Sequence, residues 1–458
     1  QELRLSFPKF KRESKLKRVL KYLFPLIIFS LLFFSCHSDN GKIKSGETEV
    51  IFWHSFISST VPALNELIDK FEKENPGIKI KPQYIPSGDA LIQKLITAIQ
   101  SKTAPDISWL HSDFIEDLVE ADAIYKMDHF IGGKDGISKE ELNDIYPALL
   151  KFSSWKGTLY SLPMEATNLA LLYNKDMFKK AGLDPNHPPK NWDELKEFSK
   201  KLTIDKNKDG NFEQVGFFVP VFPAAGPLGS WMVWQFMPFL WQAGGDYVND
   251  EQTKVLYSSD AGVKALKLWQ QLYEEQNLKT FTNLFENAFV SGNLAMAMDG
   301  PWNLPRYNDL LKHLNWGFVP LPAGPNSSAT VVGGEYLAIF KQSKNPDAAW
   351  KFLKWMIRPE VQAFWSMKSG YLPIRHAVSN VPEFKKYLEE HKNFKVFVDQ
   401  MEVGRVQKSI DYGGLEVSRN LAEAIERVTV GNMDVKKALD ESAEKSNRLL
   451  KEAKEKYD

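Results

Sequence analysis

The sequence predicts an α/β fold in which short, mostly parallel strands alternate with helices. Three observations lead to this fold class. Short apolar segments that suit strands alternate with longer segments whose apolar residues recur at helical spacing. One helix lies between the first and second strands and another between the second and third, as the connection between parallel strands requires. About 420 residues follow the N-terminal hydrophobic segment, which is enough for two domains.

Apolar spacing and turn residues define the first five elements. Val61, Leu64 and Leu67 recur on one helix face, and Asn75-Pro76-Gly77 ends that helix. The expected elements are a strand at 50–53, a helix at 61–71, a strand at 78–84, a helix at 91–99 and a strand at 107–110. This order favours a parallel sheet.

Both kinds of pattern return in the rest of the chain. Asn191 is a good N-cap for a helix that begins at Trp192, and residues 220–245 are rich in Pro, Gly and Trp. We expect helical segments at about 258–296, 346–368 and 415–457, and strands at 295–300, 315–319 and 336–340.

Side chains just beyond the strand ends are the first candidates for a binding site, because ligands of open α/β sheets lie beyond the carboxyl ends of the strands. Trp53 and His54 end the first strand, and the segment His111-Ser112-Asp113 follows the third. Asp89 can cap the second helix and face the same region. A lone histidine is more often structural, and this is the alternative for His54.

The N-terminal 35 residues predict an export signal. A basic stretch precedes an apolar run over 22–35, and a polar segment follows at once. The run is too short for a comfortable membrane span. Cys36 resembles the lipid-attachment site of bacterial lipoproteins, although Phe33-Phe34 is bulkier than the usual approach to that cysteine. We predict a signal peptide over 1–35, a lipid-anchored tether over 36–47 and an exported protein anchored at the extracytoplasmic face of a bacterial membrane. The alternative is an ordinary signal peptide with an incidental cysteine.

Composition excludes several classes of partner and site. Residues 1–35 hold eight Lys or Arg and two Asp or Glu, and removing them from the totals of 58 and 58 leaves a net charge of −6. Such a mild charge is not typical of nucleic-acid binding. Since Cys36 is the one cysteine, neither disulfides nor thiol metal sites apply. The 13 Trp, 15 Tyr and 30 Phe give an exported protein the means to grip sugar rings.

Several motifs together carry a family resemblance. They are Phe52-Trp-His-Ser55, Ala104-Pro-Asp106, the stretch from Leu171 to Leu195 with Tyr173-Asn-Lys-Asp176 and Asn191-Trp-Asp-Glu-Leu195, Gly292-Asn-Leu-Ala-Met-Ala-Met298, Gly333-Gly-Glu-Tyr-Leu-Ala-Ile339 and Ser369-Gly-Tyr-Leu-Pro-Ile374. In this order they resemble the extracellular solute-binding proteins (family 1) of bacterial ATP-driven carbohydrate importers, over nearly all of residues 48–458. The motifs are most similar to the branch that binds glycerol 3-phosphate and sugars.

The resemblance implies a two-lobed periplasmic-binding-protein fold, in which each lobe is a parallel-dominated sheet flanked by helices and the ligand cleft lies between the lobes. We place the N-terminal lobe at 48–155 plus 303–343 and the C-terminal lobe at 156–302 plus 344–458. The resemblance also implies hinge closure around the ligand and delivery to the transmembrane subunits of a permease. We expect a monomer that needs no cofactor.

Aromatic residues are the first candidates for sugar contact, because Tyr and Trp join an apolar face to a hydrogen-bonding group. Trp302, after Gly300-Pro301, is similar to a sugar-stacking Trp of the family, and Tyr371 matches a position that reaches the ligand. Among the tryptophans of 231–241 we favour Trp231, which follows a Gly-rich loop, and expect most of the others to be core. The alternative for Trp302 is packing at a hinge.

Four further positions follow from the resemblance. Gly334 matches a position where the backbone approaches the ligand closely, which suits glycine. Glu335 beside it could accept hydrogen bonds from hydroxyl groups, with a surface charge as the alternative. Glu165 and Thr167 match a ligand-lining stretch.

The position of arginine bears on a phosphate ligand, because a phosphomonoester favours Arg or a helix N-terminus. The resemblance places an arginine of the glycerol-phosphate branch near Ile410, and Arg405 is displaced from that position. This favours a neutral saccharide.

Residues 205–216 resemble an EF-hand calcium loop. The candidate ligands are the side chains of Asp205, Asn207 and Asp209 and the backbone carbonyl of Asn211. The last position of the loop, where an EF-hand has a bidentate Glu, is Gly216, and Glu213 is the candidate ligand that could compensate. We expect a possible structural Ca²⁺ here, and a metal-free Asn/Asp/Gly turn is the alternative.

The functional hypothesis is therefore a solute-binding lipoprotein that captures a mono- or oligosaccharide and is not an enzyme. The first alternative is a binding protein for glycerol 3-phosphate or a glycerophosphodiester. The second is an exported glycoside hydrolase, which needs two carboxylates across a glycosidic bond, and a scaffold or adhesin lipoprotein is a third class. No nucleophile elbow, zinc motif or phosphate-binding loop is present in the sequence.

Overall fold

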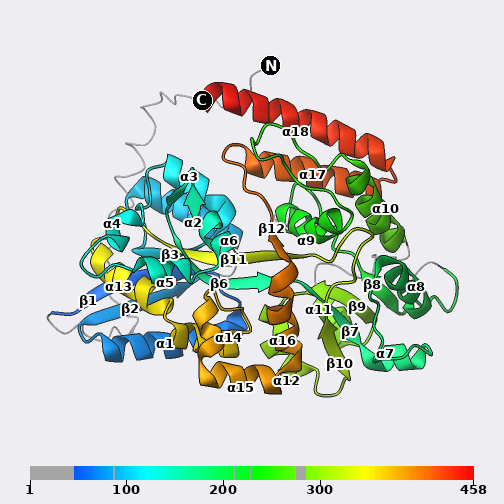
Figure 1. Ribbon diagram of the computed structural model, residues 1–458, viewed down its shortest axis with the longest axis horizontal. Coiled ribbons are helices and arrows are strands. Elements are labelled where there is room, and N and C mark those ends of the chain that lie inside the picture. The colour runs from blue at the N-terminus through cyan, green and yellow to red at the C-terminus, as the bar shows by residue number, and fades with distance from the viewer. Residues whose placement is uncertain (1–45, 86–87, 210–211, 227, 275–284, 458) are drawn as a thin grey trace, which may run out of the picture. The chain divides into compact units, whose positions relative to one another are not determined.

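The computed structural model describes residues 46–85, 88–209, 212–226, 228–274 and 285–457 (Figure 1). Residues 48–458 form one compact unit. The predicted signal peptide, Cys36 and the tether up to residue 45 lie outside the described residues. Two large β-sheets with helices around them confirm the α/β class, and each of these two sheets is the core of one lobe of a two-lobed fold.

The first sheet has six strands and contains the three strands predicted first. Along it run β12 (Gly404–Val406), β11 (Thr330–Ile339), β3 (Ile107–His111), β1 (Thr48–His54) and β2 (Ile78–Tyr84), and β6 (Leu162–Asn168) also pairs with β11. The β2, β1 and β3 strands are parallel, as predicted, while β11 runs antiparallel to β3 and β6. Val50 and Phe52 of β1 are fully buried, which explains why this central strand reads as an apolar run.

The second sheet has four strands in the order β10 (Trp316–Val319), β7 (Ala170–Asn174), β9 (Leu294–Asp299) and β8 (Val215–Phe218). Only β8 and β9 are parallel, and the other two pairings are antiparallel. The expectation of a parallel-dominated sheet in each lobe is therefore wrong for this sheet. In this sheet β7 enters directly from the first sheet and runs antiparallel to both of its neighbours, β9 and β10.

Only Leu169 separates β6 of the first sheet from β7 of the second. Its N–H and C=O both lie within hydrogen-bonding distance of the Thr330 hydroxyl, at 3.2 and 2.7 Å, and the Gln400 side chain donates to the same carbonyl at 3.1 Å. The crossing is therefore held by hydrogen bonds from β11 and from η6 (Gln400–Val403).

The predicted lobe boundaries remain a prediction, although strand pairing shows which sheet each segment joins. The β6 strand, inside the range predicted for the C-terminal lobe, pairs in the six-stranded sheet. The β10 strand, inside the range predicted for the N-terminal lobe, pairs in the four-stranded sheet.

Helices cover both sheets, and a short hairpin of β4 (Ser154–Trp155) and β5 (Thr158–Leu159) follows the sixth helix. The first group of helices comprises α1 (Val61–Glu74), α2 (Gly88–Ser101), α3 (Ile115–Glu120), α4 (Asp128–Ile131), α5 (Lys139–Asn143) and α6 (Pro147–Phe152). Then come α7 (Lys175–Lys180), α8 (Trp192–Leu202), α9 (Gly229–Gln242), α10 (Asp260–Glu274), α11 (Phe285–Val290) and α12 (Leu304–Leu310). The last are α13 (Pro346–Met356), α14 (Pro359–Ser369), α15 (Pro382–Glu390), α16 (Lys392–Asp399), α17 (Gly414–Thr429) and α18 (Val435–Tyr457).

Local sequence explains where several helices begin and end. Asn191 caps α8 by accepting from the Glu194 N–H, as predicted. The helical pattern at 346–368 is two helices, because Pro359 starts α14 after α13 has ended. The pattern at 415–457 likewise divides into α17 and α18, and α17 packs against α18, α9 and α10. No helix among the described residues has the length and apolar composition needed to cross a bilayer.

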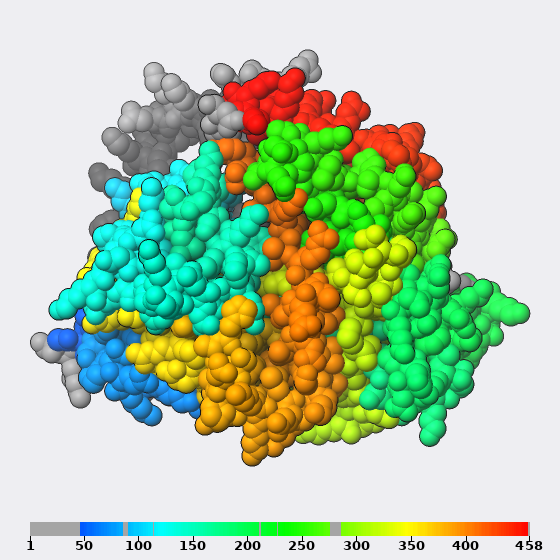
Figure 2. Space-filling view, viewed as in Figure 1, coloured from blue at the N-terminus to red at the C-terminus, as the bar shows by residue number. Residues whose placement is uncertain are grey.

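The segment from α15 to η6 braces the two sheets, and Figure 2 shows it in orange on one face of the molecule. The Asn168 side chain at the end of β6 donates to the Phe397 carbonyl at 2.8 Å. On the other sheet, the Phe318 N–H of β10 donates to the side chain of Asn393 at 3.0 Å. One helix, α16, thus contacts both sheets.

Candidate functional site

Three polar side chains form a row across neighbouring strands of the six-stranded sheet. Glu335 on β11 is the register partner of His111 on β3 and of Glu165 on β6. Because directly opposed residues of antiparallel strands share one face, the three side chains lie on the same side of the sheet. A register shift follows Glu335, and such bulges often re-aim side chains beside functional sites.

The two carboxyl groups of this row are buried against each other. Glu165 is fully buried, and Glu335 is only 8% exposed. Trp365 donates its indole N–H to Glu165 Oε2 at 2.5 Å. Glu165 Oε1 and Glu335 Oε2 receive no hydrogen bond from an N–H or hydroxyl donor, and neither glutamate forms an ion pair within the described part of the chain.

Burial and mutual repulsion decide how this pair ionises. Burial raises the pKa of Glu165 well above its usual value, and the neighbouring Glu335 charge raises it further. Burial also raises the pKa of Glu335, but His111 and the hydrogen bond from Glu165 oppose that shift. Glu165 is therefore the member of the pair that holds a proton more strongly, and Glu335 is the one that ionises first.

An aromatic pair lies beside the carboxyl pair. The rings of Trp302 and Tyr371 are 6.4 Å apart between centroids and inclined at 34°. Tyr371 is buried, and the charges of Glu335 and Glu165 add to burial in raising its pKa. Its neighbour Leu372 forms an antiparallel bridge with Ala166, the residue after Glu165, which places Tyr371 beside the carboxyl pair. Of the predicted site residues, the structure thus brings Trp302, Tyr371, Glu165 and Glu335 together.

Two glycines allow the chain to bring these rings together. A Cβ on Gly300 would lie 1.9 Å from the Trp302 ring. Gly370, directly before Tyr371, has φ +84°, and its Cβ would lie 2.2 Å from the Pro301 carbonyl oxygen. The end of α14 therefore rests on η4 (Pro301–Asn303), which carries Trp302.

The next row of the sheet extends the site toward α9. Thr167 pairs with Gly333, and each is two residues from a carboxyl of the first row, on the same face. The Thr167 hydroxyl is buried without a hydrogen-bond partner. A Cβ on Gly333 would lie 3.1 Å from the Trp234 ring, so this α9 side chain covers the gap that glycine leaves.

Trp234, rather than the predicted Trp231, is thus the α9 tryptophan beside this row. The Trp231 ring packs against Phe222 at a tilt of 37°, with ring centroids 5.5 Å apart. Sequence reasoning missed Trp365, the donor to Glu165, and it included His111 in the candidate segment after the third strand without giving it a role of its own.

Other predicted positions lie at or near the row. Ser112 follows His111 and opens η2 (Ser112–Phe114), where it is half-buried. The side chains of Asp113 and Asp89 lie outside what the structure describes. Gly334 is glycine for a packing reason, because its Cβ would lie 2.3 Å from the Glu165 carbonyl oxygen. Close approach of a ligand to Gly334 stays a prediction.

Trp53 and His54 lie in the interior of the first lobe. Trp53 is buried beneath the Lys94 ammonium, which is 4.1 Å from a ring centroid. His54 is 1% exposed and is surrounded by the rings of Phe52, Phe56 and Tyr84. This environment favours the structural alternative for His54, although its contact with a ligand is untested.

We expect His54 to stay neutral throughout the physiological range. Burial lowers its pKa from 6.5 to about 4, so the unfolded chain takes up a proton at a higher pH than the folded protein. The stability that the neutral ring contributes is complete above pH 6.5 and is lost as the pH falls toward 4. An NMR titration of the ring protons measures this midpoint, and a midpoint near 6.5 would contradict the buried placement.

The predicted calcium loop is described except for residues 210 and 211, so Asn211 lies outside the described residues. Asn207 donates its amide to Asp209 at 3.0 Å, and Glu213 accepts from the Lys206 N–H at 2.9 Å. Among the described residues, no group of three or more His, Cys, Asp or Glu side chains is arranged to hold a metal ion. The arrangement thus does not by itself fit the predicted ligand set, which includes Asp205, and calcium remains a prediction.

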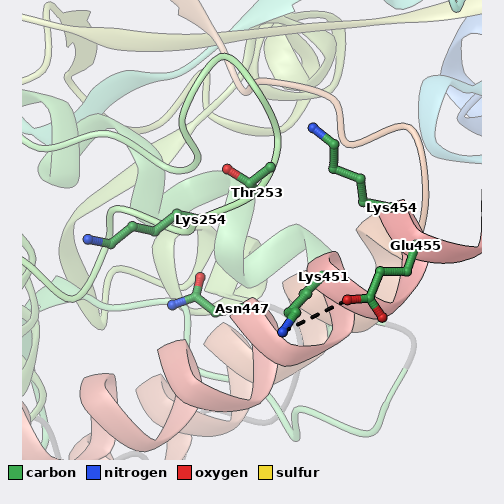
Figure 3. Close-up of a pocket in the computed structure, with 6 residues that line it drawn as sticks. All are labelled: Thr253, Lys254, Asn447, Lys451, Lys454 and Glu455. Carbon is green, nitrogen blue, oxygen red and sulfur yellow. Dashed lines mark ion pairs between the residues drawn. The ribbon is translucent and has the colours of Figure 1, made fainter. Parts of the chain in front are cut away.

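A surface cavity of about 710 Å³ lies elsewhere, along α18 (Figure 3). Its lining residues come from α18 and the segment before α10, and are Thr253, Lys254, Asn447, Lys451, Lys454 and Glu455. None of them is a predicted site residue. Surface lysines around an open hollow do not form the aromatic-lined pocket with directed polar groups that is typical of small-molecule sites.

Comparison with protein families matches residues 66–392 to the family described as bacterial extracellular solute-binding protein. Among curated proteins, the chain is 25% identical to a putative binding protein of Brucella abortus, over 92% of this chain and 96% of the relative. It is also 25% identical to the sn-glycerol-3-phosphate-binding periplasmic protein UgpB of Escherichia coli, over 88% of this chain and 93% of the relative.

Solved structures agree in fold. The cyclic α-maltosyl-1,6-maltose binding protein of Arthrobacter globiformis superposes with a TM-score of 0.75 at 26% identity, over 89% of this chain and all of that one. A solute-binding protein of an ABC transporter from Thermotoga lettingae, bound with α-D-tagatose, gives a TM-score of 0.75 at 25% identity, over 88% of this chain and all of that one. UgpB of Mycobacterium tuberculosis, at 22% identity, also has a TM-score of 0.75, over 89% of this chain and all of that one, and is similar in fold.

Proposed function

Because the chain belongs to the bacterial extracellular solute-binding protein family, we propose that it captures a neutral saccharide between its two lobes and delivers it to the permease of an ABC importer. The observation that carries this proposal is the aromatic pair Trp302–Tyr371 beside the buried carboxyls of Glu165 and Glu335. The rings offer flat faces to sugar C–H groups, and the carboxyls accept hydrogen bonds from hydroxyl groups.

Hinge closure links binding to delivery. A ligand that contacts both lobes binds the closed arrangement better than the open one and shifts the population toward it. Trp302 and Trp234 come from segments attached to the four-stranded sheet, whereas Glu165 and Glu335 belong to the six-stranded sheet. A saccharide between them therefore contacts both lobes, and the permease then recognises the closed form.

A thermal-shift screen tests the proposal directly. Protein from about residue 40 onward is mixed with neutral mono- and oligosaccharides, sn-glycerol 3-phosphate and glycerophosphocholine. A ligand at 100 times its Kd stabilises the folded state by about 2.7 kcal/mol, which is readily measured. We expect at least one neutral saccharide to raise the melting temperature. A panel in which no compound does so would count against a small-ligand receptor and favour a scaffold or adhesin.

Glycerol 3-phosphate or a glycerophosphodiester is the second candidate ligand, because the chain resembles UgpB of Escherichia coli over most of its length. The placement of Arg405 weighs against it. This guanidinium lies 4.8 Å from the Trp241 ring centroid and 3.8 Å from the Asp246 carboxylate. Ile410, at the position that the resemblance assigns to arginine, is a buried apolar residue.

Membrane attachment through a lipid on Cys36 is part of the proposal. The support is the sequence around Cys36 and membership in an extracellular family. We expect metabolic labelling of the full-length protein with a radioactive fatty acid in a bacterial host, and loss of the label in Cys36→Ser. Equal labelling of both proteins would contradict lipidation at this cysteine.

Two further properties are proposed with this function. The first is that the protein binds without turnover. Incubation with oligosaccharides should release no product, whereas product release would support the hydrolase alternative.

The second property is a structural calcium ion in the loop at 205–213. We expect the melting temperature to be higher in CaCl₂ than in EDTA, and we expect Asp209→Asn to abolish this difference.

A further inference from the structure

The buried carboxyl pair is the feature that family membership alone leaves unexplained. We propose that Glu165 and Glu335 hold one shared proton and together receive hydroxyl groups of the ligand while excluding phosphate. This inference rests on the proposed function for its ligand, but the shared proton can be tested without one.

The geometry of the pair requires a proton. Glu165 and Glu335 are register partners on β6 and β11, both side chains are buried, and one oxygen of each carboxyl has no N–H or hydroxyl donor. Two ionised carboxylates have no donor between them, so they can form a hydrogen bond with each other only if one of them is protonated. The otherwise unpartnered oxygens, Glu165 Oε1 and Glu335 Oε2, are those that a shared proton would satisfy.

The surroundings assign the proton to Glu165. Trp365 donates to Glu165 Oε2, which leaves Oε1 to carry the proton toward Glu335. The titratable groups that face the pair are His111 from β3 and Tyr371 from the segment after α14. His111 lowers the pKa of Glu335, which favours its charged form. The Trp365 N–H lowers the pKa of Glu165, but burial and the Glu335 charge raise it by more, which favours a neutral Glu165.

This arrangement selects a class of ligand. Glu335 retains lone pairs beyond the one that accepts from Glu165, and the Thr167 hydroxyl on the same face lacks a partner. A polyol can donate to the carboxylate and pair with this hydroxyl. A fully ionised phosphate group has hydrogen-bond acceptors and no donor, and the Glu335 charge repels it in a buried setting where screening is weak.

The shared proton predicts how stability depends on pH. An unfolded glutamate has a pKa of about 4.3, whereas the folded pKa of Glu165 is well above this. The stability that the protonated pair contributes is therefore complete below the unfolded pKa and is lost as pH rises through the folded pKa. Glu165→Gln is neutral at every pH and lacks this dependence.

The experiment compares melting temperatures of the wild type, Glu165→Gln and the matched control Glu423→Gln between pH 4.5 and pH 8.5. Glu423 pairs with Lys445 on the surface at 3.1 Å and is half exposed. We expect the melting temperature of Glu165→Gln relative to wild type to rise by a few degrees across this range, while Glu423→Gln follows the wild type. A constant difference between Glu165→Gln and wild type would overturn the shared proton.

A second variant covers the case in which Glu165→Gln does not fold. In Glu335→Gln the neighbouring charge is gone, so the pKa of Glu165 falls and stability depends less on pH than in the wild type. An unchanged pH profile in Glu335→Gln would again overturn the proposal.

Ligand selection is tested on the wild type with the neutral saccharides of the screen and with sn-glycerol 3-phosphate. Stabilisation by a saccharide and not by sn-glycerol 3-phosphate supports exclusion of phosphate. Greater stabilisation by sn-glycerol 3-phosphate than by any saccharide would overturn it. If no compound stabilises the protein, the proposed function fails, while the pH profiles still decide whether the proton is shared.

Discussion

Replacement of Gly370 by alanine is expected to destabilise the protein by about 3 kcal/mol, the sum of left-handed backbone strain and a steric clash in a packed region. Gly370 has φ +84°, and the added Cβ would lie 2.2 Å from the Pro301 carbonyl oxygen. Neither of these backbone segments can move freely, because Gly370 ends α14 and Pro301 starts the turn that carries Trp302. Chemical denaturation measures the loss of unfolding free energy.

Gly182→Ala is the matched control for this substitution. Gly182 also has positive φ, +74°, but no atom lies within 4 Å of its added Cβ. Its expected cost is about 1–2 kcal/mol, from backbone strain alone. If both variants lose the same stability, the contact between the end of α14 and the Trp302 turn is not tight, and the aromatic pair loses its structural support.

Trp302→Ala and Tyr371→Ala are each expected to weaken saccharide binding at least tenfold while the protein stays folded. A central aromatic side chain commonly contributes more than 1.4 kcal/mol to binding, and that amount corresponds to a factor of about ten in Kd. The two rings support each other at 6.4 Å, so the double variant should lose less than the sum of the single losses. Calorimetric titration with the best saccharide of the screen measures these affinities.

Trp192→Ala is the control for loss of an aromatic side chain away from the site. Trp192 is half-buried at the start of α8, where its indole N–H donates to Gln242 at 2.7 Å. This variant should lose some stability but keep the affinity of the wild type. If both Trp302→Ala and Tyr371→Ala bind the saccharide with wild-type affinity, the ligand site does not lie at these residues.

The part of the fold nearest the N-terminus was predictable because its signals are local. The first three strands and the two helices between them follow from apolar spacing that turn residues such as Asn75 interrupt, and the structure confirms them. The antiparallel return of β10 beside β7 was not predictable in the same way. Pairing between segments that are about 145 residues apart leaves no periodic mark in either segment.

The site was predicted in part for a comparable reason. Trp302 and Tyr371 stand in short motifs that resemble a known family, and the structure places their rings side by side. The contact between Glu165 and Glu335 depends on strand register, which sequence spacing does not specify across a chain separation of this size. The same holds for Trp234, which is one helical turn from the favoured Trp231 and is oriented by the packing of α9.

The single-residue passage at Leu169 limits how the protein can move. With one residue between two hydrogen-bonded strands, only a few backbone torsions there are available to swing one half against the other. Both polar groups of that residue are engaged by Thr330 and Gln400, so the pivot cannot drift along the chain during a cycle of opening and closing. Each cycle of opening and closing should therefore return the two lobes to the same relative orientation, so that the permease always meets the same closed conformation.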